Sequence, residues 1–96
     1  MNRESILITI SELKPEILRK YKAEIKGIFG SYARGEANED SDLDVLVHFQ
    51  KNATLLDLAG LGEFLESKLE CKVDVLSQRA MRAETVPLIM EDLIPV

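Results

Sequence analysis

The residues with the clearest chemical potential are Asp42 and Asp44, which stand two positions apart in the chain. Alternate residues of a strand point to the same face, so the two carboxylates would converge if residues 43–47 form a strand. Their mutual repulsion is costly unless something cationic lies between them. Carboxylate oxygens suit Mg²⁺, which takes its remaining ligands from water and substrate phosphates. The pair therefore predicts a divalent metal site.

Gly30 and Ser31 precede this pair, at the end of an apolar run over residues 25–29. Gly30 lets a backbone come close to a ligand, and Ser31 adds a hydroxyl. If a short helix begins at Ser31, its free amide groups would face incoming phosphates. Residues 37–41 are typical of a turn, in which Ser41 is expected to orient the Asp42 loop. One segment thus predicts both a phosphate cradle and a metal site.

Each half of this segment has an ordinary explanation when taken alone. A Gly-Ser pair after a strand is common, and an Asp-x-Asp at a strand start can be turn chemistry. Their conjunction favours function, because Asp44 lies inside an apolar run where an unpaired charge is expensive. Arg34, between the two halves, leaves two roles open: contact with a triphosphate, or a salt bridge to an acidic neighbour that holds the turn.

Asp74 is the candidate for a third carboxylate. It lies within residues 71–77, which read as another strand, and we expect it to be buried among apolar neighbours. A buried aspartate needs a metal, an ion-pair partner or hydrogen bonds. The alternative is a structural aspartate bonded to backbone amides. His48, the only histidine, is expected to be a surface residue rather than a ligand.

The remaining elements follow from apolar spacing and turn residues. Thr54 is expected to cap a helix, with Asp57 as its acidic partner. Pro15 is expected to break or restart an amino-terminal helix. The predicted helices are 5–13, 16–21, 54–69 and 84–92, and the predicted strands are 25–29, 43–49, 71–77 and, as an edge strand or tail, 94–96. The predicted fold class is α/β (α+β), with a mixed sheet of three or four strands and helices packed mainly on one face.

The 96 residues are enough for one small domain, 1–96, with a single core. No apolar run approaches the roughly 20 residues of a membrane span. The amino end lacks the features of a secretory signal, and the single cysteine, Cys71, fits a reducing cytoplasm. The net charge of −5 disfavours direct binding of nucleic acid, which needs a basic face. We therefore expect a cytoplasmic protein without a membrane or nucleic-acid surface.

Two sequence motifs resemble the signature of the DNA polymerase β-like nucleotidyltransferase superfamily. They are Gly-Ser-Tyr-Ala-Arg-Gly at residues 30–35 and Ser-Asp-Leu-Asp at residues 41–44. That signature is a Gly-Ser pair followed, after a spacer, by an Asp-x-Asp flanked by apolar residues. Ten residues separate Ser31 from Asp42 here, which fits. In so short a chain, the motif is similar to that of the minimal nucleotidyltransferase (MNT, MntA-like) proteins of bacteria and archaea, over nearly the whole chain.

This resemblance implies a mechanism and a site. Two Mg²⁺ ions, roughly 3.5–4 Å apart as in other two-metal sites, would be held by Asp42 and Asp44, with Asp74 on the ion that faces the acceptor. Gly30 and Ser31 would bind the β- and γ-phosphates of a nucleoside triphosphate, ATP. The implied nucleotide-binding set is Gly30, Ser31, Arg34 and Ser41, and the implied catalytic and metal-binding set is Asp42, Asp44 and Asp74.

The resemblance also implies a partner. MNT proteins are usually the antitoxin of a two-component system whose toxin is a HEPN-domain RNase, and some transfer AMP from ATP to a tyrosine of that toxin. A hetero-oligomer with the toxin is therefore expected. Two alternatives remain open: an antitoxin that acts by binding alone, and a nucleotidyltransferase that acts on a small-molecule hydroxyl. The lack of an acceptor-binding domain counts against the second alternative.

Overall fold

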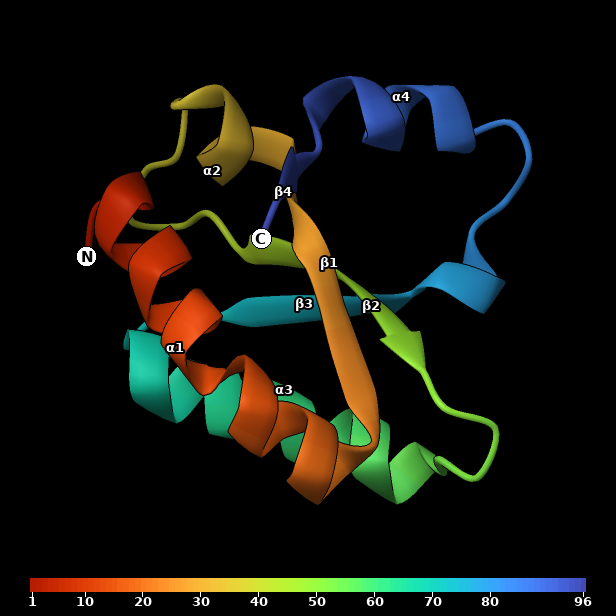
Figure 1. The fold of residues 1–96 in the computed structure, drawn as a ribbon. Coiled ribbons are helices and arrows are strands. Elements are labelled where there is room, and N and C mark those ends of the chain that lie inside the picture. The colour runs from red at the N-terminus through yellow and green to blue at the C-terminus, as the bar shows by residue number, and fades with distance from the viewer.

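The computed structural model describes all 96 residues. Its sheet has four strands in the order β3-β2-β1-β4, in which β2 and β3 are parallel and the other neighbours are antiparallel. This is the mixed sheet expected from the sequence (Figure 1). In chain order the elements are α1 Arg3–Tyr21, β1 Ala23–Phe29, α2 Gly30–Arg34, β2 Leu43–Phe49, α3 Leu55–Leu69, β3 Val73–Ser77, the 3₁₀ turn η1 Gln78–Ala80, α4 Val86–Asp92 and β4 Ile94–Pro95.

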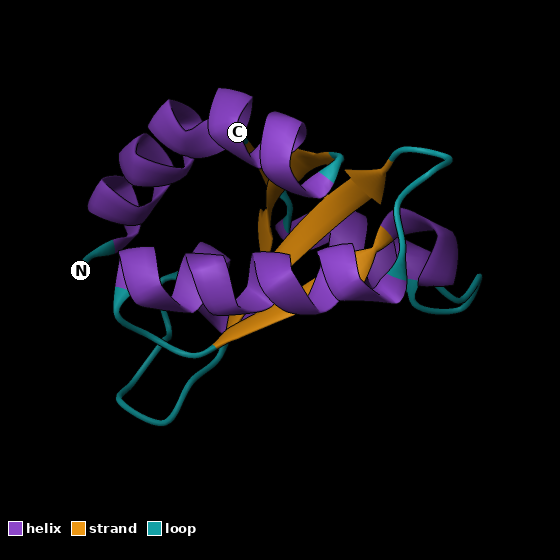
Figure 2. Ribbon diagram, turned by 90° about the horizontal axis from the view of Figure 1, so that it is seen from below, coloured by secondary structure: helices purple, strands orange, loops and turns teal.

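The two long helices, α1 and α3, lie next to one another on the same side of the sheet (Figures 1 and 2). Between them and the strands is the core, because apolar residues recur on one face of each element. Its fully buried members include Ile6, Ile10, Ile17, Ile25, Ile28, Leu43, Val45, Val47, Leu61, Leu65 and Leu69. The prediction of helices packed mainly on one face is confirmed.

Helix α1 is continuous, so the expected interruption at Pro15 is wrong. Proline removes one backbone hydrogen bond and disfavours a helix interior. The helix persists here because Ile10 and Ile17, one on each side of Pro15, are fully buried in the same core. The apolar spacing of residues 16–21 predicts that Leu18 points inward with Ile17, but Leu18 is 42% exposed. Tertiary packing therefore outweighs the local effect of the proline.

Helix α3 begins as the sequence predicts. The side chain of Thr54 accepts a hydrogen bond from the amide of Leu56, and Asp57 accepts one from the amide of Thr54 at 2.9 Å. This reciprocal arrangement stabilises the first turn. The leucine spacing of residues 55–69 predicts that Leu55 lies on the buried face of the helix, but Leu55 is 82% exposed. Gly60 packs against the ring of Tyr21 in α1, where an added Cβ would lie 2.9 Å from a ring carbon.

An irregularity in β1 between Ile25 and Gly27 decides which residues point away from the core. Ile25 and Ile28 are both buried against the helices although they are three positions apart, and a bulge of one residue allows this. Phe29 consequently pairs with Asp44 on the opposite face of the sheet, which we call the open face. Helix α4 contacts β1 and α2, at the opposite end of the molecule from α1 and α3 in Figure 1.

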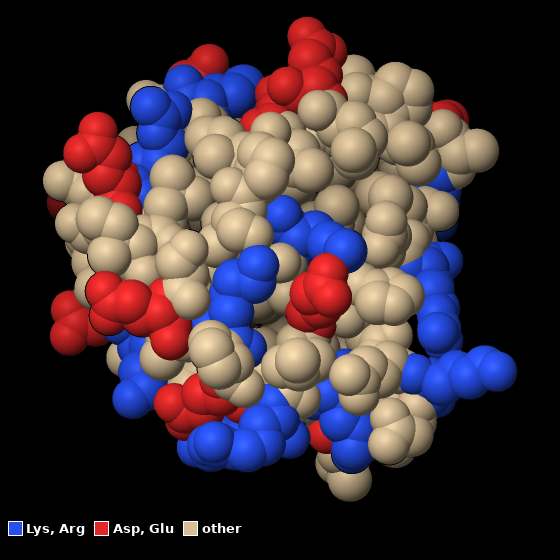
Figure 3. Space-filling view, in the orientation of Figure 1, with Lys and Arg blue, Asp and Glu red and all other residues tan.

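No helix is both long enough and apolar enough to traverse a lipid bilayer. On the face of the molecule drawn in Figure 3, acidic and basic side chains are interspersed, and the basic ones form no continuous patch.

Candidate active site

One row of residues crosses three strands at the edge of the open face. Asp44 of β2 is the register partner of Asp74 in the parallel strand β3 and of Phe29 in the antiparallel strand β1. Directly paired residues on adjacent strands, about 4.8 Å apart, carry their side chains on the same face. The register therefore brings together Asp44, Asp74 and the start of the Gly30 turn, which are far apart in the sequence.

Gly30 lies directly against Asp44. Its φ angle is +76°, and a Cβ atom there would lie 2.1 Å from the Oδ2 atom of Asp44. A positive φ of this kind is readily available only to glycine, and the space leaves no room for a side chain. The backbone at Gly30 therefore makes a close approach to a carboxylate, and the predicted approach to a ligand stays a prediction.

Helix α2 begins at Gly30, one residue earlier than expected, and no side chain caps its first turn. Its leading amides, including that of Ser31, therefore lack an intrahelical partner, as at any helix start. The helix ends after Arg34 because Gly35, with φ +76°, lets the amides of Gly35 and Glu36 bond back to the carbonyls of Tyr32 and Ser31. This short helix presents its start toward the carboxylate row.

The electrostatics of the row are concentrated on Asp44. Partial burial, followed by the negative charges of Asp74 and Asp42, raises the pKa of the Asp44 carboxyl from 3.8 to about 6. Each of these causes disfavours the ionised form. A cation at this point would relieve all three, so the electrostatic environment of Asp44 suits a bound positive charge.

Asp74 is exposed, and the expectation that it is buried among apolar neighbours is wrong. The reason is topological, since β3 is an edge strand and the long helices α1 and α3 cover the other side of the sheet. Asp42, just before β2, is also exposed. The carboxylates are neighbours, yet no three His, Cys, Asp or Glu side chains are arranged as a ready-made metal cluster.

Arg34 forms ion pairs rather than facing the row. Its Nε donates to Glu36 at 3.2 Å, and its Nη1 donates to Oδ2 of Asp92 at 2.6 Å. Of the two roles left open by the sequence, the salt bridge is the one observed. Asp92 lies 58 positions away at the end of α4, and nothing in the local sequence marks it as a partner. The pair joins α2 to α4.

Ser41 organises the loop before β2. Its hydroxyl accepts a hydrogen bond from the amide of Asn38 at 2.9 Å, and its own amide donates to the carbonyl of Asn38 at 3.1 Å. The amide of Asp40 donates to the side chain of Asn38 at 2.8 Å. These bonds close a tight turn, which agrees with the expected orienting role of Ser41.

Tyr32 is a further residue of the motif that the sequence reasoning left without a role. It packs partly buried against the core, and burial, followed by the nearby Cys71 thiol, raises the pKa of its phenol. Ala33, its neighbour, is buried, and its carbonyl accepts a hydrogen bond from Arg3 of α1 at 2.7 Å. Both contacts hold α2 in place behind the row.

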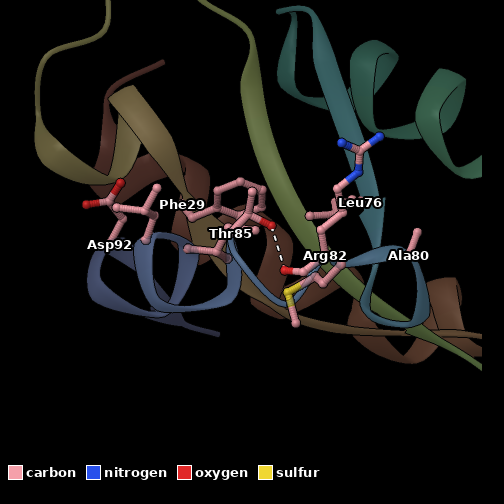
Figure 4. A pocket seen from close by; sticks show the side chains of 9 residues that line it. Phe29, Leu76, Ala80, Arg82, Thr85 and Asp92 are labelled. Carbon is pink, nitrogen blue, oxygen red and sulfur yellow. Dashed lines mark hydrogen bonds between the residues drawn. The ribbon is translucent and has the colours of Figure 1, made fainter.

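A pocket of about 450 Å³ lies on the open face beside the row (Figure 4). It is enclosed by the sheet, the segment after η1 and helix α4. Six of its nine lining residues are hydrophobic, and the full set is Phe29, Leu76, Ala80, Met81, Arg82, Thr85, Leu88, Ile89 and Asp92. In Figure 4 the hydroxyl of Thr85 donates to the backbone carbonyl of Arg82, at 2.9 Å. No feature of the sequence predicted this pocket.

The sequence matches a known family over most of its length. The profile of the nucleotidyltransferase domain family matches residues 10–95. A candidate protein adenylyltransferase of Methanocaldococcus jannaschii is 43% identical over 95 residues, which cover 90% of this chain and 96% of that protein. The protein adenylyltransferase MntA of Thermococcus cleftensis is 34% identical over 98 residues, covering 94% of this chain and 98% of that protein.

Solved structures show the same relationship. A candidate minimal nucleotidyltransferase superposes with a TM-score of 0.83 and 38% identity over 100% of this chain and 97% of that one. A toxin-antitoxin complex solved with AMP-PNP contains a chain that matches with a TM-score of 0.60 and 25% identity, over 85% of this chain and 61% of that one. The chain therefore belongs to the nucleotidyltransferase domain family and is an MNT-like nucleotidyltransferase, whose named relatives are protein adenylyltransferases.

Proposed function

We propose that this protein transfers AMP from ATP, with the help of Mg²⁺, to a tyrosine hydroxyl of a HEPN-domain toxin and thereby silences it. The observation that carries the proposal is the row in which Asp44 pairs with Asp74 on the neighbouring strand while Gly30 lies directly against Asp44. This row combines carboxylates with an open, uncapped helix start on the exposed side of a rigid sheet.

The residues of the row fit Mg²⁺. Its donor atoms are carboxylate oxygens, the ligands that Mg²⁺ prefers. The raised pKa of Asp44 reflects burial first and then the negative charges of Asp74 and Asp42, which no neighbouring cation fully offsets. Asp42, Asp44 and Asp74 would hold the metal. When bound, Mg²⁺ supplies charge neutralisation at the α-phosphorus and lowers the pKa of an oxygen nucleophile.

The chain's own residues would bind the phosphates, activate the acceptor hydroxyl and support the loop before β2. The backbone of Gly30 and the hydroxyl and amide of Ser31 would bind the β- and γ-phosphates, which leave as pyrophosphate. Asp74, on the exposed edge strand, is placed to orient and deprotonate the incoming hydroxyl from the solvent side. Fixing the hydroxyl and the α-phosphorus in line lowers the entropy cost of the step. Ser41 would support the site by fixing the loop that carries Asp42.

Two observations support a protein acceptor. Asp74, on the open face, is exposed, so a partner can present its hydroxyl there. The motif resembles that of MNT antitoxins, and a similar chain was solved within a toxin-antitoxin complex with AMP-PNP. We accordingly propose a hetero-oligomer of this protein with its toxin.

The test combines the purified protein, a HEPN-domain toxin encoded beside it, if the neighbouring reading frame is of that class, Mg²⁺ and ATP labelled at the α-phosphate. Label is expected on the toxin, at a tyrosine, and is expected to vanish with the Asp42→Asn/Asp44→Asn double variant and with EDTA. Loss of label should coincide with recovery of RNase activity. If the double variant still silences the toxin while no label transfers, the protein acts by binding alone.

A further inference from the structure

The apolar pocket lies along the strands from the carboxylate row. Asp74 and Leu76 stand two positions apart on β3 and so point to the same face, and Leu76 lines the pocket. On the other side, Phe29 lines the pocket and is the register partner of Asp44. The pocket therefore reaches the row on the β1 side and is displaced from it along β3 by about one pleat, roughly 7 Å.

The walls of the pocket suit a flat aromatic ring. Phe29, Leu76, Met81, Leu88 and Ile89 contribute apolar surface, and the volume of about 450 Å³ lies within the ~300–1,000 Å³ of small-molecule sites. The polar residues of the lining are Arg82, Thr85 and Asp92. Asp92 is held by its ion pair with Arg34, so one wall is tied to the helix that starts at Gly30.

The direction of the proposed reaction determines what enters the pocket. Pyrophosphate would lie at Gly30 at the end of β1, and the acceptor hydroxyl at Asp74 on β3, so the in-line axis runs across the strands. The ribose and base, attached to the α-phosphorus, must leave this axis sideways. Two directions lead away from the row along the strands. The loop of residues 36–42 lies in one direction, and the pocket lies in the other.

We propose that this pocket seats the purine ring of the nucleoside triphosphate, a proposal that rests on the proposed function. An acceptor side chain is the other aromatic group of the reaction. It must approach opposite to pyrophosphate, on the β3 side of the row, and a ring lodged over Leu76 would carry its hydroxyl away from the in-line position. The pocket therefore fits the base rather than the acceptor.

A fluorescence experiment tests the proposal directly, because the chain contains no tryptophan. Leu88 lines the pocket and is 65% exposed, so Leu88→Trp introduces a single reporter at the mouth without opening the core. Adding AMP-PNP with Mg²⁺ is expected to change the emission of this variant, because the base stacks on or displaces the indole. Inorganic tripolyphosphate, which has no base, is expected to leave the emission unchanged.

Leu56→Trp is the matched control. Leu56 is 84% exposed on α3, which packs on the other side of the sheet. The tryptophan emission of this variant is therefore expected to stay unchanged when either ligand is added. A second variant measures affinity. Ala80→Trp places a bulky group in the pocket at an exposed position, and it is expected to weaken AMP-PNP binding at least about tenfold while sparing tripolyphosphate. Calorimetry on each variant measures its affinity for AMP-PNP and for tripolyphosphate.

The possible outcomes distinguish failure of the pocket proposal from failure of the proposed function. If AMP-PNP binds normally by calorimetry but neither pocket variant responds, the pocket proposal is wrong and the proposed function stands. If the toxin alone, without nucleotide, changes the emission of Leu88→Trp, the pocket serves the partner and the proposal is overturned. If neither AMP-PNP nor tripolyphosphate binds the unaltered protein, the proposed function and the pocket assignment both fail.

Discussion

A side chain at position 30 would collide with Asp44, since a Cβ atom on Gly30 would lie 2.1 Å from the Oδ2 atom of that carboxylate. Gly30 is the first residue of α2, directly after β1, and Asp44 lies on the neighbouring strand β2. The motif glycine is therefore required by the carboxylate beside it as well as by its own φ of +76°. This contact ties the phosphate side of the proposed site to its metal side.

Gly30→Ala is expected to lower the rate of AMP transfer by about 100-fold, because Asp44 must move by an appreciable fraction of an ångström or more to admit the methyl group. The strained backbone is expected to cost about 1–3 kcal/mol in the free energy of unfolding. Labelled-ATP transfer and urea denaturation measure the two effects. Gly62→Ala in α3 is the control, since its Cβ would meet only a Val75 methyl, at 4.0 Å. Activity and stability equal to those of the unaltered protein in Gly30→Ala would contradict this account.

Asp44 makes stability depend on pH. Its pKa is raised from 3.8 to about 6, first by burial and then by Asp74 and Asp42, so the folded state binds a proton more tightly than the unfolded chain. The folded state is therefore penalised above about pH 6, and the penalty disappears as the pH falls toward 4.

Asp44→Asn removes this penalty. The variant is expected to be more stable than the unaltered protein by about 1–2 kcal/mol near neutral pH, a value reduced for solvent screening of a half-exposed group. The difference should vanish near pH 4, as urea denaturation of both proteins across this range will show. A stability difference that is constant with pH would rule out the ionisation of Asp44 as its cause.

Asp74→Asn separates nucleotide binding from transfer. Asp74 is exposed, so the substitution is expected to change the free energy of unfolding by less than about 0.5 kcal/mol. If the carboxylate orients and deprotonates the acceptor, transfer should fall at least about 100-fold while AMP-PNP affinity is largely kept. Asp40→Asn, an exposed carboxylate in the neighbouring loop, is the control and should retain transfer. Full transfer by Asp74→Asn would remove this residue from the mechanism.

The ion pair of Arg34 and Asp92 connects α2 to α4. A double-mutant cycle with Arg34→Ala and Asp92→Ala is expected to give a coupling of about 0.5–1 kcal/mol, as for other partly exposed pairs. The charge-reversed protein, Arg34→Asp/Asp92→Arg, should recover most of the stability and of the AMP-PNP affinity. If instead Arg34→Ala alone weakens AMP-PNP binding and the reversal restores nothing, Arg34 contacts the triphosphate directly.

Local sequence patterns were sufficient to predict several elements of this protein and its family. The apolar run around Asp44 predicted β2 to its end at Phe49, because a short run of apolar, β-branched residues is typical of a buried strand. Thr54 and Asp57 predicted the start of α3, because a capping box depends only on residues three apart. The motif from Gly30 to Asp44 was enough to indicate the family to which the chain belongs.

Other features depend on contacts between distant residues and were decided by the tertiary structure. Pro15 was expected to interrupt α1, and only the burial of Ile10 and Ile17 in one core keeps the helix whole. Asp74 was expected to be buried, and only the place of β3 at the sheet edge exposes it. Long-range packing of this kind leaves no periodic trace in the residues themselves.

The sequence alone determined the chemistry that this protein carries, since carboxylate spacing and a glycine turn are properties of adjacent residues. The tertiary structure decided how that chemistry is arranged. It paired Asp44 with Asp74 through the register of β2 and β3, joined Arg34 to Asp92 across 58 positions, and formed the apolar pocket between the sheet and α4. Register, ion pairing and cavities arise only when distant segments pack together, because no local preference specifies which of them will meet.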